Sequence, residues 1–252
     1  MNVFIVHAHP EPRSFNGALT RKAVEVLEEE GHAVRVSDLH AMGFDPISDR
    51  RSFITVKDPD YFKQQQEERY AVENGGFAPD IKTEMEKLNW CDLLILQFPI
   101  NWFSVPAMLK GWIDRVLAMG YAYDGGRRYE DGAFQGKRAM VGLTTGGGEV
   151  SFSERGLAGD IEMLLYPLHH GTLRFCGFTV LPPFISWSPA RVGGERRQGY
   201  LEAWGDRLRK IDRIAPIEYL PLSAYTEERI LRDEADLPRN SYRGSSPSRL
   251  ET

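Results

Sequence analysis

The loop at residues 9–16 has the composition of an anion-binding site. It reads HPEPRSFN and lies between a short apolar run and a segment of helical periodicity. Ser14 or Asn16 can cap that helix, whose first free N–H groups favour phosphate, and Arg13 adds positive charge. The loop also allows a plainer interpretation, in which Ser14 is only a cap and His9 is a packed core histidine. Neither GxGxxG nor GxxxxGK occurs in the chain, which excludes the two commonest nucleotide-binding motifs.

Two adjacent aromatic residues, Trp102 and Phe103, form a second candidate site. They stand in a loop between Pro99 and Pro106, directly after the apolar run at 92–98. Aromatic faces at such a place can cover a planar ring, while the backbone around them bonds the polar edge of that ring. Alternatively, the pair fills a gap between helix and sheet or belongs to an interface between subunits.

A glycine-rich loop at residues 144–149, with the sequence TTGGGE, is the third candidate. Consecutive glycines after a strand let the backbone approach a ligand closely and donate N–H bonds to it. The same sequence would also suit a plain flexible turn. Taken together, the three loops describe a phosphate site, an aromatic shelf and a glycine edge, and a flavin fits that combination better than any other cofactor.

The elements that must position these loops alternate between strand and helix. Short apolar runs predict strands, and longer amphipathic segments predict helices. A polar stretch at 48–79 is too long for a plain connection and is predicted to be an insertion with some helix. The predicted strands are 3–8, 33–39, 92–98, 137–144 and 178–187, and the predicted helices are 16–30, 80–88, 106–119, 160–175 and 199–212.

This order predicts an α/β fold, a doubly wound parallel sheet with right-handed crossovers and helices on both faces. Five strands suit a flavodoxin-like sheet better than a six-stranded dinucleotide-binding one. In such a sheet ligands bind at the carboxyl ends of the strands, where the three loops lie. The composition changes near residue 215, so we expect a flavin-binding domain at 1–212. A C-terminal extension at 213–252, with a serine-rich end at 241–248 and little core of its own, would follow it.

Composition restricts the class of protein further. The chain has 252 residues, a formal net charge of −5, and no basic stripe of the kind that binds nucleic acid. No apolar run approaches the roughly 18 to 20 residues of a membrane span, and no secretory signal is visible. The two cysteines cannot form a disulfide framework, so a reducing cytoplasm is the expected compartment.

At the three loops and beyond, the sequence carries recognisable motifs. They run in register from about residue 2 to residue 207, and comprise His9 with 14–16, then 37–39, 42–47, 57–59, 97–112, 144–147, 159–160, 175–178 and 201–204. In these motifs the chain resembles the NAD(P)H:quinone oxidoreductase (DT-diaphorase) family of flavodoxin-like flavoproteins. The resemblance implies a homodimer with its active site at the interface.

The resemblance also implies roles for individual residues. Flavin contacts would come from His9, Ser14, Phe15, Asn16, Ala18, Pro99, Ile100, Asn101, Trp102, Phe103, Thr144, Thr145, Gly146, Gly147, Arg197 and Leu201. The site where nicotinamide and quinone alternate would be lined by Trp102, Phe103, Tyr123, Arg128, Gly146 and Phe175, several of them from the partner subunit.

The chain departs from the best-known members of the family at several positions. A tyrosine and a histidine that assist hydride transfer there fall on Phe152 and Ala158, so no protein residue is assigned as catalytic. A second pocket tyrosine and a methionine fall on Gly125 and Arg128. One branch of the family binds a metal, but here Arg174 stands where a second histidine would join His170. We therefore expect no metal, and interpret 169–170 as surface or helix-packing histidines.

The function implied is two-electron hydride transfer from NAD(P)H through flavin to a small quinone, by a ping-pong mechanism. FAD is favoured over FMN, because the insertion at 57–79 runs in register with FAD-binding relatives, although residues 63–65 differ from them. The alternative is a non-catalytic flavoprotein, either a flavodoxin-like electron carrier or a regulatory subunit. A carrier would be more acidic around its flavin and would need no aromatic shelf for nicotinamide.

Overall fold

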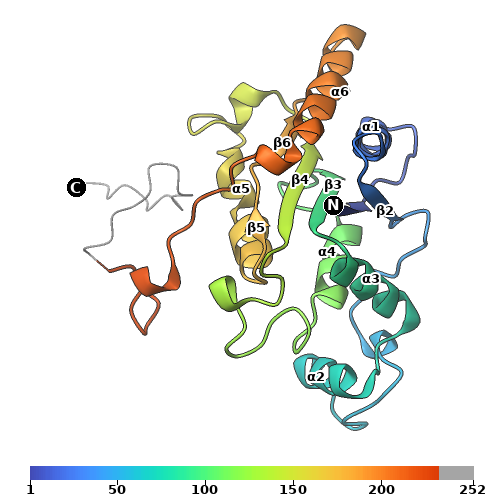
Figure 1. Cartoon of the computed structure of the whole chain (residues 1–252), viewed down its shortest axis with the longest axis vertical. Coiled ribbons are helices and arrows are strands. Elements are labelled where there is room, and N and C mark those ends of the chain that lie inside the picture. Colours follow the sequence, from blue (N-terminus) through green and yellow to red (C-terminus); the bar gives the residue numbers. More distant parts are fainter. Residues whose placement is uncertain (233–252) are drawn as a thin grey trace.

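A parallel sheet runs through the middle of the structure, a computed structural model that describes residues 1–232 (Figure 1). Its strands follow the order β2-β1-β3-β4-β5, and β6 also pairs with β4. The long strands are β1 (Asn2–His7), β2 (Ala33–Asp38), β3 (Leu93–Pro99) and β4 (Arg138–Thr144). The flavodoxin-like α/β fold is confirmed, with the strand order expected of it.

The fifth predicted strand is wrong as a single element. Residues 178–187 form two short strands, β5 (Thr179–Val180) and β6 (Phe184–Ser186), which pair with opposite ends of β4. Pro182 and Pro183 lie between them and have no N–H group to donate to a neighbouring strand. The ladder is interrupted there, so β6 is added as a sixth strand to the predicted order of five.

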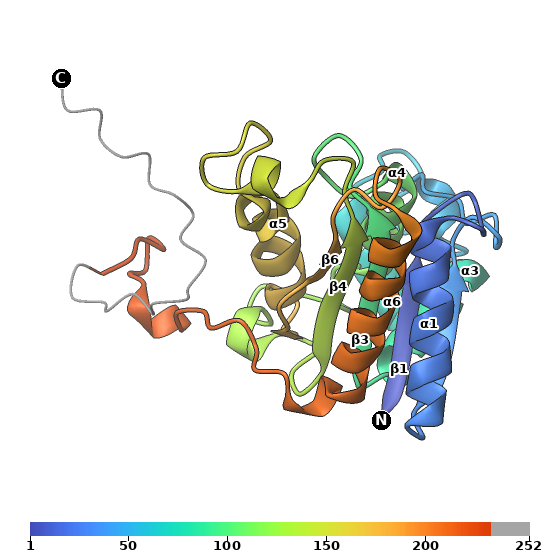
Figure 2. The same ribbon diagram turned by 90° about the horizontal axis from the view of Figure 1, so that it is seen from above.

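Helices cover both faces of the sheet (Figure 2). One face carries α1 (Phe15–Glu29) and α6 (Gly194–Arg209), which pack against each other. The other carries α3 (Pro79–Trp90), α4 (Ala107–Val116) and α5 (Ile161–Leu168). Alternate residues of β1 serve the two layers: Val3 and Ile5 pack with α1 and α6, and Phe4 and Val6 pack with α3 and α4.

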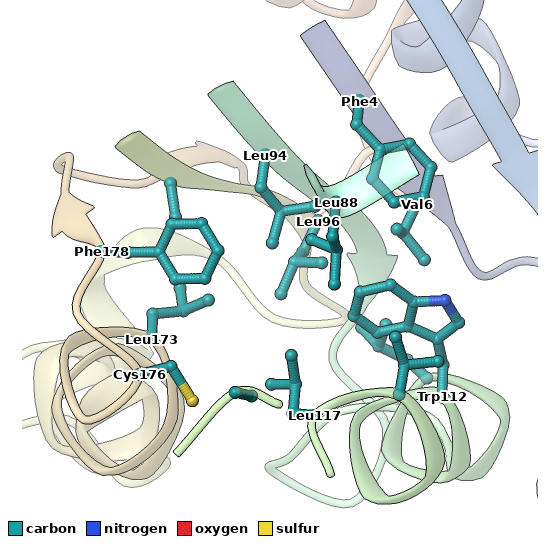
Figure 3. Packing of buried hydrophobic residues seen from close by; sticks show 14 of the residues in the cluster. Phe4, Val6, Leu88, Leu94, Leu96, Trp112, Leu117, Leu173, Cys176 and Phe178 are labelled. Carbon is teal, nitrogen blue, oxygen red and sulfur yellow. The ribbon is translucent and has the colours of Figure 1, made fainter. Parts of the chain in front are cut away.

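The second of these layers is the larger, and Figure 3 shows its packing. Trp112 of α4 lies against Phe4, with ring centroids 6.2 Å apart. Its Nε1 donates to Oε2 of the fully buried Glu84 at 2.9 Å. Lys87 and Ser37 bond the other carboxylate oxygen, so the buried charge of Glu84 is paired.

The predicted helix at 160–175 is divided. After α5, which contains Pro167, the chain continues as the wider π-helix η4 (His169–Arg174). The insertion contains η1 (Arg50–Ser52) and α2 (Gln64–Asn74). The remaining short helices are η2 (Tyr129–Asp131), η3 (Glu149–Phe152), η5 (Ile211–Arg213) and η6 (Leu222–Ala224).

The described part of the C-terminal extension is tied to the body of the protein. Arg138 at the start of β4 donates to the carbonyls of Ile211 and Ile214, both at 2.7 Å. Further along, the Ile217 N–H donates to the carbonyl of Val180 at 2.8 Å. The serine-rich end predicted at 241–248 lies outside the described residues, and the domain boundary near 212 stays a prediction.

A buried histidine in η4 makes stability depend on pH. Burial lowers the pKa of His169 from its ordinary 6.5 to about 4, so the folded chain holds it neutral while the unfolded chain protonates it. Its contribution is fully present above pH 6.5 and is lost as pH falls from 6.5 toward 4, about 3 kcal/mol in all. Urea unfolding at pH 7.5 and 5.0 should show about 2 kcal/mol of this loss in the wild type and a smaller loss in His169→Leu. Equal losses in both proteins would contradict it.

Candidate functional site

The three predicted loops meet at the carboxyl edge of the sheet, after the adjacent strands β1, β3 and β4 (Figure 2). The side chain of Asn16 connects them. Its Nδ2 donates to Thr144 Oγ1 at 2.8 Å, and its Oδ1 accepts from Gln97 Nε2 at 2.8 Å. Each end of this buried amide therefore has one partner within the protein, which fixes the orientation of the side chain between the three loops.

The β1–α1 loop has the donors of an anion site. Ser14 caps α1, its Oγ accepting from the Gly17 N–H at 3.1 Å, so the prediction of a cap is confirmed for Ser14 rather than Asn16. The N–H groups of Phe15 and Asn16 have no acceptor among residues 1–232 and lie at the positive end of the helix. Ala18 donates its own N–H to the Ser14 carbonyl, so it offers only its methyl group.

His9 adds a donor of defined tautomer. Its Nδ1 accepts from the Glu11 N–H at 3.0 Å, which leaves the proton on Nε2. Burial lowers the pKa of His9, so the ring is neutral at pH 7 and Nε2–H remains a hydrogen-bond donor. Arg13, in contrast, is exposed and paired with Glu11 at 3.1 Å, so its charge is partly neutralised before any ligand binds.

The aromatic pair is held in a strained turn. Trp102 and Phe103 have φ angles of 48° and 59°, a left-handed region that bulky residues rarely adopt. Reciprocal backbone bonds between Asn101 and Ser104, both 3.0 Å, fix the turn. The side chain of Trp102 is 96% exposed and that of Phe103 is 52% exposed. Trp102 therefore fills no gap between helix and sheet, and its face is available to a ligand or a second subunit.

The glycine loop fits a closely approaching ligand. A Cβ at Gly146 would meet nothing within 4 Å, which leaves open space beside the backbone. A Cβ at Gly147 would lie 2.8 Å from Ser151 Oγ and 3.1 Å from the Phe152 ring, so a larger residue there would require these side chains to shift. Thr145 holds the loop, with its Oγ1 donating to the Gly147 carbonyl at 2.7 Å. The loop is therefore held in one conformation by its own hydrogen bonds and is not a plain flexible turn.

The start of α6 closes the same edge. Tyr200 packs edge-on to Phe15, with centroids 6.3 Å apart, and Leu201 lies beside it in the core formed by α1 and α6. Arg197 is exposed, and its Nη1 donates to the carbonyls of Val192 at 2.9 Å and Pro189 at 3.4 Å. Among residues 1–232 its Nε and Nη2 groups have no acceptor, so they can donate to an anion.

We expect Arg197→Ala to weaken flavin binding. A hydrogen bond to a charged group contributes about 1.5 to 3 kcal/mol, so the dissociation constant should rise about tenfold or more. Arg209→Ala provides a matched control, because this arginine lies at the far end of the same helix. Flavin titration of the apoproteins measures both constants. An unchanged constant for Arg197→Ala would remove the residue from the phosphate site.

Tyr123, Arg128 and Phe175 are not brought to this edge. Tyr123 follows the last turn of α4, which begins at the carboxyl edge and extends about 15 Å away from it. Phe175 packs on Tyr123 with centroids 5.5 Å apart, and both line a 350 Å³ cavity with Gln65, Glu68 and Asp114. A single chain thus places the predicted site residues at two separate ends of the sheet.

Glu68 in this cavity was not predicted from the sequence. It is buried, and its carboxylate accepts from the Met119 N–H at 2.7 Å and from Gln64 Nε2 at 2.8 Å. Burial raises its pKa. In the sequence Glu68 is one acidic residue in a polar helix, and no spacing distinguishes it from its solvated neighbours.

The fold and the position of the three loops agree with the known proteins that this chain resembles. Residues 1–210 fit the family model described as flavodoxin-like fold. The chain belongs to the flavodoxin-like family. It is 45% identical over 216 residues to ribosyldihydronicotinamide dehydrogenase [quinone] of Pongo abelii, covering 85% of this chain and 94% of that protein.

Two further relatives have similar names. NAD(P)H dehydrogenase [quinone] 1 of Cavia porcellus is 42% identical over 222 residues, 88% of this chain and 81% of that protein. A crystal structure of a putative quinone reductase from Klebsiella pneumoniae is 37% identical, with a TM-score of 0.89, covering 94% of this chain and 98% of that one. The resemblance to NAD(P)H:quinone oxidoreductases, predicted from the motifs, is confirmed.

Phe152 and Ala158, which stand where better-known relatives have a tyrosine and a histidine, lie next to each other in this flavodoxin-like protein. The Ala158 N–H donates to the Ser151 carbonyl at 2.9 Å, which brings residue 158 next to Phe152. Phe152 is buried against Trp187, with ring centroids 5.7 Å apart. Neither side chain can hold or move a proton.

The histidines at 169–170 pack within the protein. His169 is fully buried, and His170 stacks on Tyr166 with centroids 4.8 Å apart. Arg174 Nη1 lies 2.7 Å from His170 Nε2. Among residues 1–232 no group of three or more histidine, cysteine or acidic side chains could hold a metal ion, and no helix is long and apolar enough to cross a membrane.

Proposed function

We propose that this protein is a flavin-dependent NAD(P)H:quinone oxidoreductase that works by a ping-pong mechanism as a homodimer. The observation that carries the proposal is the exposed Trp102–Phe103 turn, held in a strained conformation beside an anion loop and the glycine loop at 144–149. A bound flavin supplies the redox chemistry, accepting a hydride from one substrate and passing it to the other. The relatives named as quinone dehydrogenases support the same reaction.

The residues of this chain would bind the flavin and orient the two substrates beside it. His9 Nε2–H, the N–H groups of Phe15 and Asn16, and Arg197 would hold the phosphates of the cofactor. Residues 99–103 and 144–147 would contact its ring. The N–H groups of Gly146 and Gly147 would favour negative charge as it develops at the ring edge. Trp102 and Phe103 would form one wall of the space that nicotinamide and quinone enter in turn.

A second copy of the chain would supply the opposite wall. Tyr123, Arg128 and Phe175 lie away from the carboxyl edge of their own chain, so in this proposal they line the site of the other molecule. Two copies related by a twofold axis would form two equal sites at one interface. Because nicotinamide and quinone would share each site, the first product must leave before the second substrate binds.

FAD is the proposed cofactor, with FMN as second choice. The insertion that the FAD-binding relatives share forms α2, whose Gln65 and Glu68 line the polar cavity beside Tyr123. In the proposed dimer the polar lining of this cavity would suit the adenosine of an FAD held by the other subunit. We also propose a cytoplasmic location, consistent with the free, buried Cys91 and Cys176. The alternative, a non-catalytic electron carrier, gives no role to the exposed aromatic turn.

Mixed dimers test the shared site. Trp102→Ala and Phe175→Ala should each lower NAD(P)H-dependent reduction of a simple benzoquinone. Co-purified dimers that carry one copy of each variant should regain one intact site, and so about half the wild-type activity per dimer. Activity no higher than that of the single variants would contradict an interface site. Heat release of the bound cofactor, identified by chromatography, decides between FAD, FMN and none.

A further inference from the structure

Residues 123–131 form the segment that presents Tyr123 and Arg128. Tyr129 within it has a φ of 53°, a strained value for a bulky residue. Its N–H donates to the Phe175 carbonyl at 2.9 Å, and its ring packs edge-on to the Phe175 ring at 5.3 Å. A conformation of this kind persists only where surrounding contacts hold it.

Arg174 supplies those contacts from η4. The side chain is 9% exposed, and its guanidinium lies 5.1 Å from the centroid of the Tyr129 ring. Nη2 donates to Glu130 Oε1 at 3.0 Å, and Nη1 is bonded to His170 Nε2. The same guanidinium therefore contacts two consecutive residues of the 123–131 segment.

The opposite side of Arg174 contacts the C-terminal extension. Its guanidinium lies 4.8 Å from the centroid of the Tyr219 ring, and Nη2 also donates to the carbonyl of Leu220. His170 packs edge-on to Tyr219 at 5.4 Å and tilted to Tyr129 at 5.6 Å. Two segments 90 residues apart in sequence thus meet on one buried cation.

We propose that Arg174 is a positioning residue that clamps the 123–131 segment to the C-terminal extension and so sets the substrate wall formed by Tyr123 and Arg128. The inference rests on the proposed function, in which that wall serves the active site of the other subunit. It gives the extension a role: residues 217–220 brace a loop that would otherwise relax from its strained turn.

The geometry requires arginine. A planar guanidinium can stack between two rings and donate from its edge to a carboxylate, an imidazole and a carbonyl at once. A lysine ammonium keeps the charge but cannot make the stack and the fork together. Arg174→Lys therefore removes the contacts of the guanidinium while it keeps the positive charge.

The test combines hydrogen–deuterium exchange with steady-state kinetics on the full-length, flavin-loaded protein. In Arg174→Lys, amide exchange across 124–131 should quicken about tenfold or more, because a buried charge-assisted bond is lost. The KM for a benzoquinone should rise to a similar degree, while kcat changes less than about twofold and flavin content stays the same.

Arg138→Lys is the matched control. This arginine also binds the extension, through the carbonyl of Ile214, and has no hydrogen bond to the 123–131 segment. It should leave the exchange at 124–131 and the KM unchanged. A second pair of variants, at Tyr219, keeps the test valid if Arg174→Lys does not fold. Tyr219→Leu should quicken amide exchange at 124–131, and Tyr219→Phe, which keeps the ring, should not.

Unchanged exchange at 124–131 in both Arg174→Lys and Tyr219→Leu would overturn the proposal, and so would an equal increase in Arg138→Lys. Faster exchange with an unchanged KM would overturn the role in substrate positioning. A wild-type protein without reductase activity would refute the proposed function instead, and the exchange measurements would still decide whether the clamp exists.

Discussion

Trp102→Ala should slow the reduction of the bound flavin by NAD(P)H about 10²-fold, since misplacing a reacting group by about 1 Å can cost that much. The indole is 96% exposed in the single chain, so its removal takes no packing from the core. We therefore expect the free energy of unfolding to change by less than about 0.5 kcal/mol. Single-turnover stopped-flow kinetics measure the rate constant directly.

A matched control shows whether the slower reduction comes from the loss of Trp102 in particular or from the loss of any exposed apolar side chain. Ile230 is 65% exposed in the C-terminal extension, which forms none of the three site loops, and Ile230→Ala should leave the rate constant unchanged. Trp102→Phe should recover most of the rate, because it retains an aromatic face. A wild-type rate constant in Trp102→Ala would show that this residue is not part of the site.

Restoring a proton relay should accelerate the same step. Phe152 and Ala158 cannot exchange protons, so the wild-type rate constant should vary less than about threefold between pH 6 and 8. The double variant Phe152→Tyr with Ala158→His places a donor pair at adjacent positions of one loop. General acid–base assistance is typically about 10²–10⁴-fold, and we expect the lower end because no other residue has adapted to the new pair.

The pH dependence of the rate constant shows whether the new pair acts as a proton relay. The double variant should acquire a dependence with an apparent pKa near that of histidine, about 6.5, that the wild type lacks. Phe152→Tyr alone serves as the control and should stay pH-independent. A steep profile in the wild type would mean that another residue already acts as the relay, and the reading of positions 152 and 158 would be wrong.

Much of the fold could be predicted from the sequence because hydrophobic periodicity determines it. The alternation of β1, with Val3 and Ile5 on one face and Phe4 and Val6 on the other, follows directly from its burial on both sides. Two predicted elements were divided. Pro182 and Pro183 interrupt the fifth strand, because neither has an N–H to donate to a neighbouring strand, and the predicted helix at 160–175 continues after residue 168 as a π-helix.

The candidate site could be predicted only in part. Its loops were predictable from residue types after strands, and Ser14 was predictable as a cap. The internal use of the Asn16 amide was not, since its partners Gln97 and Thr144 are 81 and 128 residues away. The position of Arg174 between two rings was equally hidden, because its partners come from segments on either side of η4 in the chain.

Anaerobic stopped-flow mixing of the purified, flavin-loaded protein with NADH, followed by a benzoquinone, tests the central claim most directly. We predict that NADH bleaches the flavin absorbance in one phase. One equivalent of quinone should then restore it without a one-electron intermediate, and steady-state double-reciprocal plots should be parallel. A protein that binds flavin at residues 9–16, 99–103 and 144–147 but is not bleached by NADH or NADPH would contradict the account and support an electron carrier instead.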